Sequence, residues 1–287
     1  MNPTLEQIAK HGRAQAPAAD YWSLRLVDER QESLSVRQDI VQPPSTRLSR
    51  GAFITVVDAG GIGYAATGDL GSSGLGAAFE RAREWAHLTA GRHLLTADEV
   101  THCGGTGTYK HPVATPWSAL STQDRVDMVR RAGQSLKASD RIVDWWSWLT
   151  ARQVDTLFVS SDGAHIGQAF HLVDPGLRAV ANAGSQTQVR TGGGARGARQ
   201  GGVELLDDLG FHTDGRRIAE EALALLEAPE CPEVVTDLLL MPSQMALQIH
   251  ESIGHPLELD RILGDERNYA GTSFVSQDMI GTYRYGS

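Results

Sequence analysis

The sequence predicts an α+β fold in which strands and helices form separate layers. Two observations support this prediction. Several stretches of alternating apolar and polar residues precede the first amphipathic helix, at residues 75–88. A second series then follows in the order helix, strands, helix, between residues 122 and 226. Strands do not alternate with helices as they do in a doubly wound parallel sheet, so we expect a mostly antiparallel sheet with packed helices.

The first part of the chain predicts strands followed by a helix. Residues 20–41 show two patches of alternation, which predict two strands around a polar turn at residues 28–32. Residues 51–64 predict a hairpin whose turn is Asp58-Ala59-Gly60-Gly61. The helix at residues 75–88 then has an apolar face, made of Ala78, Phe79, Ala82, Trp85 and Ala86.

The second part begins after a connector at residues 91–120 that is rich in Gly, Thr and Pro. Residues 122–137 predict a helix with Val126, Val129 and Ala132 on one face. Strands are predicted at residues 144–148, 156–159, 177–183 and 186–190, with a turn at residues 161–163. A glycine-rich stretch at residues 191–202 leads to a helix at residues 214–226.

A domain boundary is expected at residues 228–232, Ala-Pro-Glu-Cys-Pro. The N-terminal α+β domain then spans residues 1–230, with subunits at about 20–98 and 120–228, and residues 231–287 begin a second domain. In that domain we expect a buried strand at residues 233–240 and a helix capped by Ser243. Short strands are expected at residues 271–275 and 279–287. The small size of this region predicts that the chain is a fragment cut inside its second domain.

Composition narrows the classes of function. The 287 residues carry a formal net charge of −9, which argues against a nucleic-acid or anionic-membrane binder, since such proteins depend on a basic face. No apolar run approaches the roughly 20 residues of a membrane span, and the N-terminus has no secretory signal. The two cysteines imply no disulfide framework. These features predict a cytoplasmic protein.

The stretch His-Glu-Ser-Ile-Gly-His, residues 250–255, carries the candidate chemistry. Two histidines and a glutamate are the groups that bind zinc and act as the base in metallopeptidases. The histidines here are five residues apart, which places them about 140° apart on a regular helix. The helix must therefore break between them. In one alternative the helix ends near Ile253, Gly254 adopts a left-handed conformation, and Pro256 restricts His255 to an extended backbone, so that His255 turns back toward His250. In the other, a π-bulge in the helix brings the two imidazole rings together.

Two interpretations of these six residues remain open. In the first, His250 and His255 bind zinc and Glu251 takes a proton from a metal-activated water. In the second, His250 caps or packs in a core and Glu251 lies on a solvated face. The six residues alone do not decide between them.

The wider sequence resembles the TldD/PmbA family, also called modulator of DNA gyrase, on its TldD-like side. The resemblance rests on HESIGHPLELDRI followed by NYAGTSFV, and on QTQVRTGGGARG with a helix ending ALALLEAPECP. The segment VDAGGIGYAATGDL also resembles the N-terminal region of the family. The similarity extends from about residue 20 to the end of the chain. One departure is Pro256, where the family commonly has glycine or another small residue.

The resemblance implies a zinc metallopeptidase that acts on small or unfolded peptides. Its motif histidines correspond to His250 and His255, and its glutamate to Glu251. The third zinc ligand of the family is a cysteine well beyond the motif, and no cysteine follows His255 in this sequence. The resemblance also implies that a β-rich metallopeptidase domain begins after residue 230, and that the chain binds a PmbA/TldE-like partner subunit or self-associates. The alternative is a non-catalytic binding or assembly module of such a heterodimer.

Four other groups are weaker candidates, and each has a simpler structural explanation. His102, Cys103 and His111 match no closed zinc pattern, so a plain loop is the preferred interpretation. Residues 191–202, with Arg196 and Arg199, lack the Lys-Ser/Thr of a phosphate loop and predict a substrate-edge or flexible loop. Tryptophans on a strand are commonly divided between the hydrophobic core and an interface, and this is the preferred interpretation here. The tryptophans concerned are Trp145, Trp146 and Trp148. Glu258 and Asp260 are either partners of the imidazole N–H groups or part of a solvated turn.

Overall fold

A computed structural model describes residues 3–92, 104–193 and 197–284 of the chain. The chain divides into two compact units, Met1–Pro229 and Glu230–Ser287. The first contains the sheet and its helices, and the second contains the His-Glu-Ser-Ile-Gly-His stretch. Among the described residues, no helix is long and apolar enough to cross a membrane.

The first unit is built on one long sheet, which in the described residues has nine strands in the order β4-β3-β1-β6-β7-β5. Its neighbouring strands are antiparallel, apart from the parallel pair β5 and β7. Short β2 pairs with β1, and β8 and β9 both pair with β7. The strands are β1 (Tyr21–Arg37), β2 (Ile40–Val41), β3 (Ser45–Asp58), β4 (Gly61–Thr67), β5 (Thr106–Lys110), β6 (Ile142–Ser160), β7 (His165–Ala183), β8 (Gln186–Gly193) and β9 (Arg199–Gln200).

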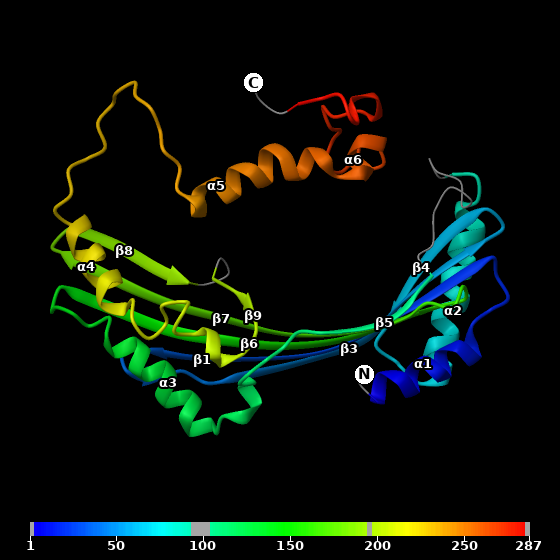
Figure 1. Cartoon of the computed structure of the whole chain (residues 1–287), viewed down its shortest axis with the longest axis horizontal. Coiled ribbons are helices and arrows are strands. Elements are labelled where there is room, and N and C mark those ends of the chain that lie inside the picture. Colours follow the sequence, from blue (N-terminus) through cyan, green and yellow to red (C-terminus); the bar gives the residue numbers. More distant parts are fainter. Residues whose placement is uncertain (1–2, 93–103, 194–196, 285–287) are drawn as a thin grey trace. The chain divides into compact units, whose positions relative to one another are not determined.

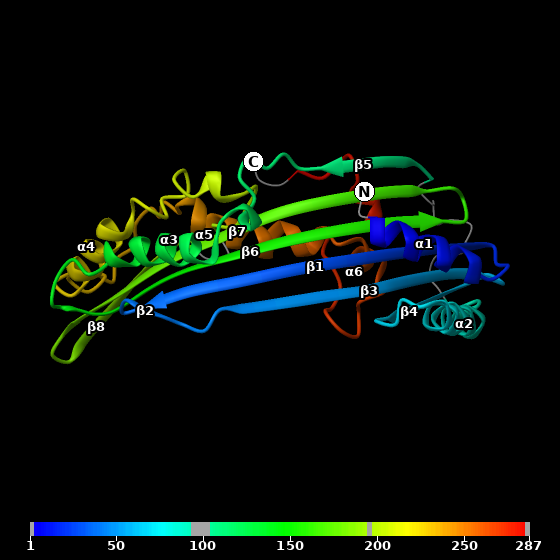
Figure 2. The same ribbon diagram turned by 90° about the horizontal axis from the view of Figure 1, so that it is seen from below.

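The helices cover one face of this sheet in two groups, as Figures 1 and 2 show. On β1, Leu24 and Leu26 belong to one hydrophobic core and Leu34 and Val36 to the other. All four positions are even-numbered in one strand, so both cores lie on the same face. The first core packs α1 (Pro3–Gln15) and α2 (Ser72–Thr89), and the second packs α3 (Thr122–Gln134) and α4 (Gly215–Leu225). The predicted α+β fold is confirmed.

The strands are longer than the sequence predicts. The predicted turn at residues 28–32 is wrong, because β1 is continuous and pairs with β3 on one side and β6 on the other. Its carboxylates have ion partners on other elements. Asp28 contacts Arg50 of β3 at 2.6 Å, and Glu32 contacts Arg125 of α3 at 2.8 Å. The strands predicted at residues 144–148 and 156–159 are likewise one strand, β6.

The predicted hairpin and helices of the first unit are largely confirmed. The turn between β3 and β4 has positive φ at Ala59 (54°) and Gly60 (76°), as a type I′ turn requires. In β4, a Cβ on Gly63 would lie 1.9 Å from the carbonyl oxygen of Ala82, so glycine permits the close approach of α2. The predicted place of Trp85 on the apolar face is wrong, since that side chain is 53% exposed.

Replacing Phe79 by alanine is expected to lower the free energy of unfolding by about 3–5 kcal/mol, because the substitution leaves a cavity in the core. Phe79 is fully buried in α2 and packs edge-on against Trp22, with ring centroids 5.7 Å apart. Trp85→Ala, on the exposed side of the same helix, should cost about 0.5 kcal/mol or less. Urea denaturation followed by circular dichroism measures both values. Equal losses would contradict the assignment of Phe79 to the core.

The second unit contains fewer regular elements than predicted. Residues 233–240 do not form the predicted buried strand: Leu239 is 87% exposed, and no pairing strand contacts this segment among the described residues. The short strands predicted at residues 271–275 and 279–287 are also absent as far as residue 284. The helices are α5 (Pro242–Ile249) and α6 (Leu259–Leu263). Met241 occupies the N-cap of α5 with Pro242 at its first turn, so the predicted capping role of Ser243 is wrong.

Candidate metal centre

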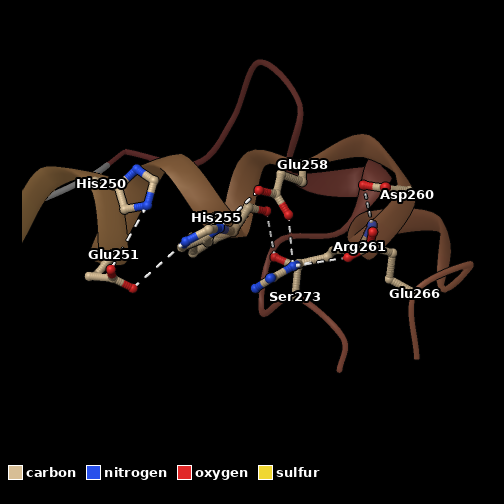
Figure 3. Close-up of polar contacts among 9 residues, drawn as sticks. His250, Glu251, His255, Glu258, Asp260, Arg261, Glu266 and Ser273 are labelled. Carbon is tan, nitrogen blue, oxygen red and sulfur yellow. Dashed lines mark hydrogen bonds and ion pairs between the residues drawn. The ribbon is translucent and has the colours of Figure 1, made fainter. Parts of the chain in front are cut away.

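His250, Glu251 and His255 lie close together in the second unit. One possible ligand atom from each residue lies within 4.8 Å of the other two. The two imidazole rings face each other edge to face, with centroids 4.3 Å apart and planes at 69°. The carboxylate of Glu251 approaches both rings: its oxygens lie 3.9 Å from Nε2 of His250 and 3.8 Å from Nε2 of His255. Figure 3 shows this arrangement.

The backbone achieves this convergence through a π-helical turn, His250–Gly254, that follows α5 directly. The N–H of His255 donates to the carbonyl of His250, five residues earlier. Such a turn places residues five apart on one side of the helix, where a regular α-helix would separate them. Of the two predicted breaks, the π-bulge is the one present. The left-handed Gly254 is not, since its φ is −59°.

A carboxylate fixes the orientation of His255. Nδ1 of His255 lies 2.8 Å from Oε1 of Glu258, which leaves Nε2 on the side of Glu251. The other oxygen of Glu258 lies 2.8 Å from Nε of Arg261. The contact predicted for Glu258 is therefore present. Asp260 instead accepts a hydrogen bond from the N–H of Arg261.

The turn that carries His255 is tied to a later segment. The Ser273 hydroxyl donates to the carbonyl of Pro256 at 2.6 Å, and it accepts from the N–H of Val275 at 2.9 Å. Val275 is buried. Pro256 itself lies in a short 3-10 turn, His255–Leu257, so this departure from the family pattern leaves His255 beside Glu251. No sequence signal pointed to Ser273.

Two family models match the first unit of the chain. Residues 22–86 match the PmbA/TldA metallopeptidase domain 1, and residues 115–226 match the PmbA/TldA metallopeptidase central domain. Together these matches cover more than half of the chain. The chain belongs to the PmbA/TldD family.

Individual relatives of this PmbA/TldD chain agree with that assignment. A protein of Methanothermobacter thermautotrophicus named metalloprotease is 27% identical over 283 residues, which is 93% of this chain and 59% of the relative. A solved structure of a candidate modulator of a DNA gyrase from Thermotoga maritima shares the fold, with a TM-score of 0.63, 18% identity and coverage of 79% of this chain. TldE from Thermococcus kodakarensis also shares it, with a TM-score of 0.53, 16% identity and coverage of 78%.

The PmbA/TldD chain described here spans only part of these relatives. It covers 59% of the curated metalloprotease and 50% and 47% of the two solved chains. Both matched family domains lie in the first unit, whereas the histidines lie in the second.

Membership of a metallopeptidase family implies a metal ion, and the second unit has a donor set that fits one. Two imidazole nitrogens and a carboxylate are ligands that zinc and related ions accept. The side chains of His250 and Glu251 are 57% and 61% exposed, so both groups are accessible to solvent. Cys231 is not part of the group: it is exposed, and its Sγ contacts the carbonyl of Pro232.

A second acidic cluster lies beside this group in the PmbA/TldD chain. Oxygens of Glu258, Asp260 and Glu266 come within 4.8 Å of one another. Arg261 lies among them, at 2.8 Å from Glu258 and 3.6 Å from Glu266. The guanidinium therefore compensates the negative charge of Glu258 and Glu266.

The weaker candidate groups do not form sites in the described residues. His102, Cys103 and Arg196 lie outside the described residues, while His111 lies 3.4 Å from the Tyr109 hydroxyl. Arg199 belongs to β9 and pairs with Val173.

The three tryptophans of β6 divide between the faces of the sheet, as a strand requires. Trp145 packs against the core beneath α3, and Lys137 lies over its ring. Trp146 and Trp148 contact each other on the opposite face, with centroids 5.4 Å apart. This agrees with the prediction that only some of these tryptophans lie in the core.

Proposed function

We propose that this chain is the zinc-binding part of a metallopeptidase that cleaves small or unfolded peptides. The observation that carries the proposal is the convergence of His250, Glu251 and His255 on a π-helical turn. Membership of the PmbA/TldD family and the relative named metalloprotease support it.

In this proposal the three side chains have distinct roles. His250 and His255 hold the zinc ion through their Nε2 atoms, both of which lie on the side of Glu251. When bound, zinc makes a water molecule more acidic and polarises the scissile carbonyl. Glu251 accepts the proton of the attacking water and passes it to the leaving amine. Glu258 accepts the Nδ1–H of His255, which keeps Nε2 free for the metal.

The third zinc ligand in this proposal is the cysteine that the family resemblance implies. Within the described part of the second unit, no cysteine joins the two histidines. The proposal therefore takes this ligand from outside the 287 residues, and the relatives are long enough to supply one. We expect weak metal binding and weak catalysis from the 287 residues alone.

A second candidate function is that of a non-catalytic assembly module. The observation that favours it is the fold shared with TldE from Thermococcus kodakarensis. The family resemblance gives TldE-like proteins the role of the partner subunit. Under this alternative the chain docks a PmbA/TldE-like partner. Size-exclusion chromatography with and without such a partner tests the docking, and a chain that stays monomeric in both runs counts against it.

Metal-dependent hydrolysis tests the proposed activity. A protein that contains this chain at the length of its relatives should cleave an unstructured peptide, stop when a chelator is added, and recover with zinc. Mass spectrometry of the products would also locate the bond that is cleaved. Cleavage that continues at full rate in excess chelator would refute the metallopeptidase proposal.

A further inference from the structure

A cavity opens between α1 and the strands β5, β7 and β6 of the first unit. It encloses about 240 Å³ and lies on the helix-covered face of the sheet. Figure 2 shows β5, β7 and β6 side by side near α1. The cavity belongs to the first unit, and the histidine cluster belongs to the second.

Small residues on the central strand form the floor of this cavity. Gly167 and Ala169 of β7 both line it. The two residues are two positions apart on the strand, so both face the cavity. Because neither has a long side chain, space remains above the middle of the strand. His171 follows at the next alternate position and also lines the cavity. The hollow is therefore a product of the sequence of β7 together with the helix above it.

Opposite charges stand on the two sides of this floor. Lys110 of β5 is in register with Ala169, and Ala169 is in register with Asp155 of β6. The three residues form one row across three strands, and residues in such a row point to the same face. Two strand spacings separate the backbones of Lys110 and Asp155, a distance of about 9.5 Å. A cation and an anion thus border the cavity, with alanine between them.

Neither charge has an ion partner within the part of the chain that the structure describes. Asp155 accepts one hydrogen bond from Gln153 at 3.2 Å and has no ion pair there. The Lys110 side chain is exposed and makes no hydrogen bond or ion pair with the described residues. The other charged wall residue differs, because Glu6 of α1 already pairs with His165 at 3.1 Å. Lys110 and Asp155 are therefore the charges available to a ligand.

His171 adds a neutral polar group at the end of the floor. Burial lowers the pKa of its imidazole, an effect that Asp155 opposes and Lys110 strengthens. The ring is therefore uncharged at neutral pH. Its nitrogens have no hydrogen-bond partner among the described side chains, so they can donate to or accept from a bound molecule.

We propose that this cavity binds a small zwitterion of dipeptide length. Asp155 binds the ammonium end, Lys110 binds the carboxylate end, and Ala169 leaves space for the peptide unit between them. A single amino acid carries its two charges on one carbon, which is too short to reach both sides of the row. Charge-assisted hydrogen bonds at the two ends would then determine the affinity.

Calorimetric titration of the metal-free 287-residue chain with dialanine tests this proposal, and a chelator prevents any contribution from the histidine cluster. We expect saturable binding with about one site per chain. N-acetyl-dialanine lacks the ammonium and dialanine amide lacks the carboxylate, so each should bind at least about tenfold more weakly. These probes leave the protein unchanged, so the comparison does not depend on the folding of a variant.

Variants assign each end of the ligand. Asp155→Asn should bind dialanine and N-acetyl-dialanine with similar affinity, because the group that distinguishes them is gone. Lys110→Gln should do the same for dialanine and its amide. Asp208→Asn, at an exposed carboxylate away from the cavity lining, is the matched control and should behave as the wild type. The absence of saturable binding, or equal affinity of the wild type for the blocked peptides, would overturn the proposal.

Discussion

His250→Ala is expected to abolish metal binding, with zinc falling from about one equivalent per chain to near zero. Elemental analysis measures this in a protein of the length of its relatives after dialysis against zinc. The reason is geometric: in the proposed site, His250 and His255 would hold the ion through their Nε2 atoms, which lie 3.9 and 3.8 Å from the Glu251 carboxylate oxygens. The variant would leave one imidazole and the cysteine that the family resemblance implies, and two ligands do not form a strong zinc site in water.

Two further variants serve as references for this measurement: one should weaken metal binding in part, and the other should leave it unchanged. Glu258→Gln keeps both histidines but replaces the carboxylate that holds Nδ1 of His255 at 2.8 Å, so the metal affinity should fall by about 10- to 100-fold. His212→Ala is the matched control, because His212 also pairs with a carboxylate, Asp207 at 2.6 Å, but lies in the first unit. Its zinc content should not change. Full zinc retention in His250→Ala would return both histidines to a structural role.

The candidate site was predictable from the sequence because its residues are local. Six consecutive residues contain both histidines and the glutamate, and their spacing showed that a regular helix must be interrupted. The form of the interruption was not predictable. A left-handed Gly254 and a π-turn both bring His255 back, and the choice rests on the hydrogen bond from His255 N–H to the His250 carbonyl.

The lengths of the strands were less predictable, because distant residues determine them. The run from Asp28 to Glu32 has the composition of a turn, yet it continues β1 because strands on both sides pair with it. Apart from Arg30, its compensating arginines lie on other elements, and Arg125 of α3 contacts Glu32 across 93 residues. The pKa of Glu32 is lowered although burial opposes this, since Trp117, Arg30 and Arg125 stabilise its charge. Periodicity alone contains none of these contacts.

At residues 233–240 the prediction was wrong in the opposite direction: a strand was expected, but none is formed. The composition of this apolar run predicts a buried strand, but a strand needs a neighbour for its backbone N–H and C=O groups. The described residues of the second unit form no strand, so this run remains without regular structure and is largely exposed. Composition predicted the tendency of the segment, whereas the presence of a partner decides its conformation.

Glu251→Gln is expected to lower the rate of peptide hydrolysis by about 10²- to 10⁴-fold, because glutamine has nearly the same shape but cannot accept a proton. The measurement is kcat on an unstructured peptide with a protein of the length of its relatives. Glu233→Gln is the matched control, since Glu233 is an exposed glutamate of the same unit that lies outside the histidine cluster, and its kcat should not change.

The zinc content of Glu251→Gln distinguishes two possible roles of Glu251, general base and metal ligand, which the distances alone do not distinguish. The Glu251 oxygens lie at nearly the same distance from both imidazoles, 3.9 and 3.8 Å, as either a ligand or an adjacent base would. If Glu251 is the base, the variant keeps its zinc and loses its activity. If Glu251 is a ligand, zinc and activity fall together, and retained activity would exclude the assigned role. We expect the first result, because the cysteine implied by the family resemblance would complete a three-ligand site and leave the carboxylate free to take the proton.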